Sequence, residues 1–155
     1  MTNSVPHALL QGTASMGMML LAGGLIGRAF CFRRQITVRE ARMTKTANLL
    51  FWTGSGVAVT ANIWIRFLDA QAGFFRISNP FLLAQIAVFA AILGLDVWPT
   101  RKFRSWSRYL DLDQTPYFTD REFNSIRRLW RIQTFLLVLM PFFAPLIRTG
   151  LGTPK

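Results

Sequence analysis

The stretch "ILGLDVWPTRKFR", Ile92 to Arg104, decides the fold class because its character changes twice within a few turns. An apolar run stops at Asp96, Trp98 and Pro99 follow, and a group of cations comes directly after them. Tryptophan at the border of a long apolar run, with Lys and Arg beyond it, is typical of a helix that leaves a bilayer on the cytoplasmic side. We expect Pro99 to end this helix and Asp96 to be an interfacial carboxylate paired with nearby cations.

Uncharged stretches of similar length recur on both sides of this boundary. They lie between His7 and Arg28, Lys45 and Arg66, Arg76 and Asp96, and Arg131 and Arg148. At about 1.5 Å per residue they give helices of roughly 24 to 30 Å, close to the hydrocarbon thickness of a bilayer. The expected transmembrane segments are residues 8–27, 46–67, 80–97 and 129–147.

The composition supports a membrane protein with one domain, residues 1–155. Hydrophobic residues make up 52% of the chain and charged residues 16%, so little polar sequence remains to cover four apolar helices in water. Lipid offers no partners to backbone N–H and C=O groups, which requires helices in such spans. We predict an all-α, integral membrane bundle of four transmembrane helices. For any single span the alternative is a buried core helix of a soluble protein.

The distribution of cations predicts the orientation. Six of the eighteen Lys and Arg residues lie in segment 28–45 and eight lie between residues 98 and 131. By the positive-inside rule, loops 28–45 and 98–128 are cytoplasmic, loop 68–79 is on the outer side, and both chain ends face outward. This separation of cations between uncharged stretches also argues against nucleic-acid binding, in spite of the net charge of +11.

The first apolar segment is expected to remain as an anchor, because cations follow it and no cleavage site is evident. The single cysteine, Cys31, excludes an internal disulfide, and the single histidine, His7, is insufficient for a haem held between helices. No catalytic motif is present. We therefore expect a protein that is not an enzyme, with no catalytic residue, metal site or cofactor, and we assign no cofactor-binding residue.

Small and amide side chains are the candidates for contacts between helices. Small residues allow the close backbone approach that associates helices in lipid. The predicted packing residues are Gly12, Gly17, Gly23, Gly27, Gly54, Ala58, Ala87, Ala91 and Gly94. Neutral amides at membrane depth are predicted to hydrogen-bond between helices as structural contacts: Asn48, Gln85 and Gln133.

The loop before the fourth span predicts a basic amphipathic helix at the membrane surface that runs into that span. Thr119 and Glu122 have the spacing of a capping box at its start. The acids in this loop are expected to pair with neighbouring arginines, and the aromatic residues Trp98, Trp106, Tyr109 and Trp130 to form an interfacial belt. The residues predicted to contact anionic lipid headgroups are Arg33, Arg34, Arg101, Lys102, Arg104, Arg127 and Arg128.

Two stretches carry a resemblance to a known family: "ANIWIRFLDAQAGFFRISNPFLLAQIAVFAAILGLDVWPTRKFRSW" and "LLVLMPFFAPLIRTGLG". From about Thr37 to Gly152 the chain resembles an uncharacterised bacterial family of predicted membrane proteins, domain-of-unknown-function family 2214. The resemblance implies a multi-pass protein of the bacterial cytoplasmic (inner) membrane. It also implies that three ionisable family positions inside the membrane fall here on Asn48, Gln85 and Gln133.

Two functions remain open from the sequence. The preferred hypothesis is a non-catalytic accessory subunit that packs against other subunits of a larger membrane complex, for which an energy-transducing complex, respiratory or photosynthetic, is one host. The alternative is an independent carrier or sensor of a small lipidic ligand, such as a quinone or pigment. Its support is an interior predicted to be rich in aromatic residues and methionine, with Met16, Met18 and Met19 in the first span.

Overall fold

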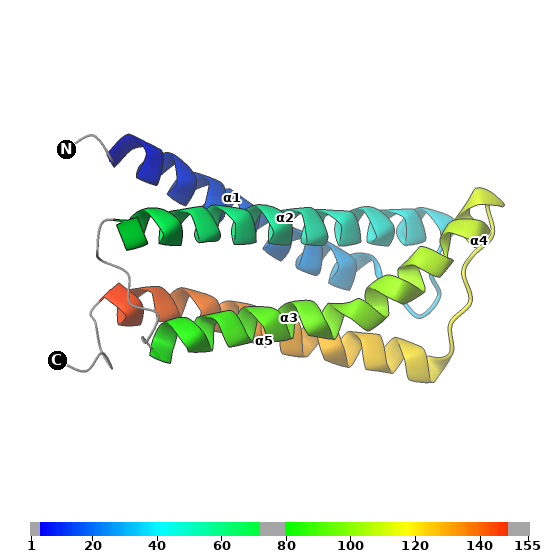
Figure 1. Ribbon diagram of the computed structural model, residues 1–155. Helices are drawn as coiled ribbons and strands as arrows, with labels where there is room; N and C mark the ends of the chain where they lie inside the picture. The colour runs from blue at the N-terminus through cyan, green and yellow to red at the C-terminus, as the bar shows by residue number, and fades with distance from the viewer. Residues whose placement is uncertain (1–3, 72–79, 149–155) are drawn as a thin grey trace. The chain divides into compact units, whose positions relative to one another are not determined.

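The computed structural model describes residues 4–71 and 80–148, and within these ranges the regular structure is entirely helical (Figure 1). The helices are α1 (Ser4–Cys31), α2 (Val38–Gln71), α3 (Pro80–Ser105), the short α4 (Ser107–Asp111) and α5 (Asp120–Arg148). The prediction of an all-α chain is confirmed. The helices form two compact units, one containing residues 1–32 and 42–76 and the other residues 33–41 and 77–155.

Small residues bring α1 and α2 together in the first unit. A Cβ atom at Gly17 would lie 2.6 Å from the backbone N of Ala58, and one at Gly24 would lie 2.5 Å from the backbone N of Phe51. Gly54 meets the other helix in the same way, since its Cβ would lie 2.7 Å from the carbonyl oxygen of Gly17. Backbone packs on backbone at these three glycines, which is the contact that associates helices in lipid.

The helix α2 begins at Val38, well before the apolar stretch that was expected to define it. Thr37 and Glu40 form a capping box: the Thr37 backbone N–H donates to Glu40 Oε2 over 2.9 Å, and the Glu40 N–H donates to Thr37 Oγ1 over 3.2 Å. Two N–H groups at the helix start are thereby satisfied. The signal was present in "TVRE" and was missed, because only the apolar part of the helix was considered.

In the second unit α3 and α5 pack as a pair (Figure 1). The buried residues of α3 include Ile92, Asp96, Pro99 and Phe103, which recur at helical spacing on one face. The prediction that Pro99 ends the helix is wrong, because α3 continues to Ser105. Proline within a helix removes one hydrogen bond at a cost of about 3 kcal/mol. Burial of the proline ring and of Phe103 in the following turn offsets that cost.

An aromatic cluster holds α3, α4 and α5 together near the loop that connects α4 and α5. The ring centroid of Phe103 lies 4.7 Å from that of Trp106 and 5.9 Å from that of Trp130. The ring centroids of Phe118 and Phe123 are 6.0 Å apart. Trp106 and Trp130 are only 4% and 2% exposed. These two residues are therefore core residues, which corrects the prediction that they belong to an interfacial belt, whereas Trp98 and Tyr109 are exposed.

Two helical stretches among the described residues are long and apolar enough to cross a membrane, Val5–Cys31 and Pro80–Asp111. The predicted outer loop lies largely in residues 72–79, outside the residues that the structure describes.

The close approach at Gly54 yields a prediction with a control two residues away. Gly54→Ala places a methyl group against backbone atoms of α1, which cannot yield easily, and should lower the free energy of unfolding by about 1–3 kcal/mol. Gly56→Ala, where a Cβ would meet nothing within 4 Å, should leave it unchanged or raise it by up to about 1 kcal/mol through helix propensity. Denaturant titration in detergent micelles, followed by circular dichroism, measures both. Equal effects of the two substitutions would contradict the packing described.

Candidate functional site: buried polar groups in the two helix pairs

The first unit contains a buried guanidinium. Arg28 is 0% exposed, in the last part of α1, and its Nη1 donates a hydrogen bond of 2.8 Å to Asn48 Oδ1 on α2. Its guanidinium carbon lies 4.2 Å from the centroid of the Phe51 ring, in a cation–π arrangement. A cation near the C-terminus of a helix is also favoured by the helix dipole. Arg28 was assigned to a cytoplasmic loop from the sequence, and the structure corrects this.

The second unit contains a buried carboxylate. Asp96 is 0% exposed on the face of α3 that packs on α5. Thr100 Oγ1 donates to Asp96 Oδ2 over 2.8 Å, one turn further along the same helix. Gln133 Nε2 on α5 donates to the carbonyl oxygen of Ile92 over 2.8 Å and lies 3.4 Å from Asp96 Oδ1. Asp96 is thus enclosed between two helices, which corrects the expectation that it lies at an interface.

The two helix pairs share one chemical arrangement. In each pair, a fully buried ionisable side chain forms a hydrogen bond with a neutral amide on the other helix. Arg28 donates to Asn48, and Asp96 accepts from Gln133. Each helix pair therefore encloses an ionisable group beside the neutral amide that the sequence predicted there. Helical spacing contained the signal, because Arg28 continues the buried face of Leu21 and Gly24.

The third predicted amide, Gln85, is half-buried in α3 and makes no side-chain hydrogen bond to another described residue. The predicted packing residues also divide into two groups. Gly17, Gly54 and Ala58 lie at the contact of α1 with α2, and a Cβ at Gly27 would lie 3.3 Å from that of Ala47. The others are exposed, so they make no close contact between described helices: Gly12, Gly23, Ala87, Ala91 and Gly94.

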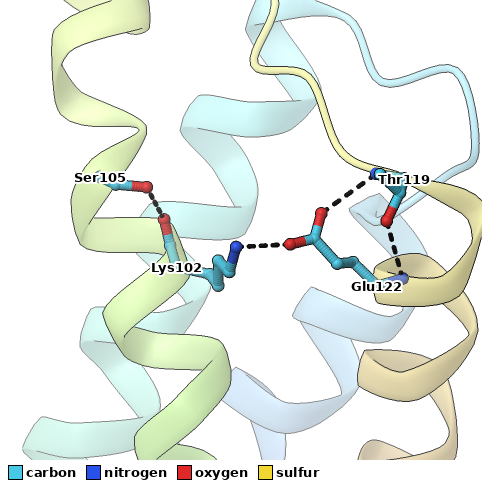
Figure 2. Close-up of polar contacts among 4 residues, drawn as sticks. All are labelled: Lys102, Ser105, Thr119 and Glu122. Carbon is cyan, nitrogen blue, oxygen red and sulfur yellow. Dashed lines mark hydrogen bonds and ion pairs between the residues drawn. The ribbon is translucent and has the colours of Figure 1, made fainter.

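Ion pairs take up several of the residues that were expected to meet lipid headgroups. Figure 2 shows Lys102 on α3 paired with Glu122 on α5, while Thr119 and Glu122 form the predicted capping box, which is confirmed. The guanidinium of Arg34 donates two hydrogen bonds to Asp120, of 2.9 and 2.5 Å. Arg33 lies 3.7 Å from Glu40, and the guanidinium of Arg127 lies over the ring of Phe123.

These contacts shift the pKa values of three carboxylates. The ammonium group of Lys102, together with the Thr119 N–H, lowers the pKa of Glu122. The guanidinium of Arg34 lowers the pKa of Asp120, and the backbone and hydroxyl groups of Thr37 lower the pKa of Glu40. A lowered pKa stabilises the folded state above the ordinary pKa of the group, and the contribution is lost as the pH falls through the folded value. All three carboxylates are thus charged at neutral pH.

The contact between Arg28 and Asn48 can be tested within α2. Asn48→Leu removes the acceptor from a buried cation and should lower the free energy of unfolding by about 1.5–3 kcal/mol, the usual value of a hydrogen bond to a charged group. Asn62→Leu is the control, because Asn62 is exposed and its side chain bonds only to the carbonyl of Ala58 in its own helix. That variant should change stability by less than about 0.5 kcal/mol. A loss as large for Asn62→Leu as for Asn48→Leu would refute the role of the buried pair.

Comparison with known proteins gives one match. No curated protein matches the chain. No solved structure matches it either. A family model described as "Predicted membrane protein (DUF2214)" matches residues 7–152, which is nearly the whole chain and includes all five helices in large part. The resemblance noted in the sequence is confirmed, and the chain belongs to this family of predicted membrane proteins.

Proposed function

We propose that the protein is a non-catalytic accessory subunit of a larger complex in the bacterial cytoplasmic membrane. In this proposal α1, α2, α3 and α5 each cross the bilayer, with both chain ends outside and the two basic connections inside. The positive-inside pattern and membership in a membrane-protein family support the topology. The partner is a transmembrane helix of another subunit, and it packs laterally on α1.

The observation that carries the proposal is an exposed, largely apolar face of α1 that contains two glycines. Positions on this face follow one another at alternating spacings of four and three residues, and all are exposed: Val5, Leu9, Gly12, Met16, Met19, Gly23, Ile26 and Phe30. We refer to these eight residues as the α1 stripe. It lies apart from the residues that pack on α2, such as Gly17 and Gly24.

The two glycines favour a helix over lipid as the neighbour of the α1 stripe. The spacing of the stripe only defines one face of α1, because every face of an α-helix repeats at three or four residues. A Cβ at Gly12 or Gly23 would meet nothing within 4 Å, so both glycines leave hollows between longer side chains. Hollows of this kind let the backbone of a second helix approach closely.

Two of the three methionines that supported a ligand carrier do not line an interior, whereas Met18 is half-buried. Met16 and Met19 are 62% and 74% exposed and belong to the α1 stripe. This corrects the expectation for two of the three methionines that supported the alternative function, and it adds flexible apolar side chains to a surface that adapts to a partner.

The proposal predicts a partner that depends on the hollows of the stripe. The tagged protein purified from its native membrane in mild detergent should carry a stoichiometric subunit. Gly12→Leu with Gly23→Leu fills both hollows and should reduce the recovered subunit by about tenfold or more, equivalent to about 1.4 kcal/mol. Ala87→Leu with Ala91→Leu, on an exposed face of α3, is the matched control and should not reduce it.

A photo-crosslinking residue tests whether this partner lies against the α1 stripe. Incorporated at Met19, it should cross-link the recovered subunit, and incorporated at the exposed Ile63 of α2 it should not. A protein that purifies alone or only with itself would refute the proposal. So would a partner that the two leucine pairs affect equally.

A further inference from the structure

We infer that Arg128 and Arg131 on α5 bind the phosphate of an anionic phospholipid, whose acyl chain lies along Phe135, Val138 and Phe142. This inference goes beyond the proposed function, because it concerns α5 and a lipid, whereas the accessory role concerns α1 and a protein partner. It depends on charge, exposure and the register of α5 against α3.

The two arginines are exposed and make no ion pair with another described residue. Other cations of the same unit are engaged: Lys102 with Glu122, Arg34 with Asp120, and Arg127 over the ring of Phe123. Arg128 and Arg131 are three residues apart on a helix, so their guanidinium groups lie on neighbouring positions of one face. Two forked guanidinium groups in that position suit the oxygen atoms of one phosphate.

The face that bears the two arginines continues as an apolar surface. Phe135 follows Arg131 by four residues and Arg128 by seven, so it lies on the same side of α5. Val138 and Phe142 extend this side, and the three side chains are 64%, 59% and 63% exposed. One continuous face of α5 therefore offers cations first and bulky apolar groups next, which matches a phosphate followed by an acyl chain.

The register against α3 sets the depth of the arginines. Gln133 bonds to the carbonyl of Ile92 and lies near Asp96, so Arg131, two residues away, is roughly level with Asp96. On α3 the first cation beyond the apolar stretch is Arg101, five residues or about 7 Å further along the axis. Arg131, the cation that borders the apolar stretch of α5, therefore lies closer to the middle of the helix pair than Arg101, the corresponding cation of α3.

A guanidinium at that depth favours an anion close to it. It can extend its aliphatic stem toward the headgroup layer, as arginines near helix ends do, and meet a lipid phosphate there. The charge of the site selects an anionic lipid over a zwitterionic one, because a neutral headgroup offsets the attraction to its phosphate with its own cation.

Native mass spectrometry of the intact chain in detergent micelles tests the inference by titration with phosphatidylglycerol. The wild-type protein should retain phosphatidylglycerol in preference to phosphatidylcholine. Arg128→Gln with Arg131→Gln should weaken binding by about 30-fold, about fivefold for each lost cation. Arg101→Gln with Arg104→Gln loses the same charge from α3, away from the arginine face of α5, and should weaken binding by less than about threefold.

Further measurements distinguish the remaining explanations for weaker lipid binding. Circular dichroism of each variant should show unchanged helix content, since all four arginines are exposed. Inorganic phosphate in excess should not displace the lipid. Equal weakening by the two arginine pairs, equal retention of phosphatidylcholine, or displacement by inorganic phosphate would each overturn the inference. None of these outcomes depends on whether α1 binds a protein partner.

Discussion

A hydrogen bond between a buried ionisable side chain and a neutral amide fixes the register of each helix pair. Arg28 meets Asn48 between α1 and α2, and Asp96 meets Gln133 between α3 and α5. A charged group enclosed in an apolar interior destabilises the fold unless it is satisfied, so a slip of one turn in either pair would leave it without that partner. The backbone contacts at Gly17, Gly24 and Gly54 are compatible with only this register, because any side chain larger than hydrogen would collide there.

Some features of this arrangement could be predicted from the sequence, and others could not. Helicity and family membership followed from patterns that involve many residues, and the capping box at Thr119 and Glu122 followed from a local pattern with a defined mechanism. The exact ends of helices did not follow. Pro99 has the local character of a helix end, but packing of Phe103 and Trp106 continues α3 beyond it, and such tertiary contacts have no counterpart in a local pattern.

The same limit applies to the charged and aromatic residues at the helix ends. Arg28, Asp96, Trp106 and Trp130 were placed at a surface because residues of these types usually lie there. Arg28, Asp96 and Trp130 are buried because their positions in the helical repeat direct them toward a neighbouring helix. Trp106, in the turn between α3 and α4, is buried against Phe103 and Phe118. Residue type therefore predicted exposed side chains at these positions. For those that lie in helices, the helical spacing predicts burial, as the structure shows. For the three amides, the prediction from residue type agreed with the structure in part: Asn48 and Gln133 join helices, and Gln85 makes no such contact with another described residue.

The burial of these groups leaves two exposed faces with different chemistry. The α1 stripe is apolar along its whole length and contains two glycines, which suits a helix. The outer face of α5 changes from arginine to bulky apolar residues, which suits a phospholipid. Under the two proposals, a protein partner lies on one face and a phospholipid on the other, as expected of a subunit at the periphery of a complex. The buried polar contacts join the two helices within each pair.

The orientation of the chain in the membrane is tested most directly by labelling single cysteines with a membrane-impermeant maleimide. In a Cys31→Ser background, a cysteine replaces Ser4, Gln35 or Gln114 in turn; the last two are exposed residues in the connections that precede α2 and α5. Four crossings with both basic connections inside predict labelling of the Ser4→Cys variant in intact cells, and of the Gln35→Cys and Gln114→Cys variants only after the membrane is opened. Labelling of either connection in intact cells would contradict the account.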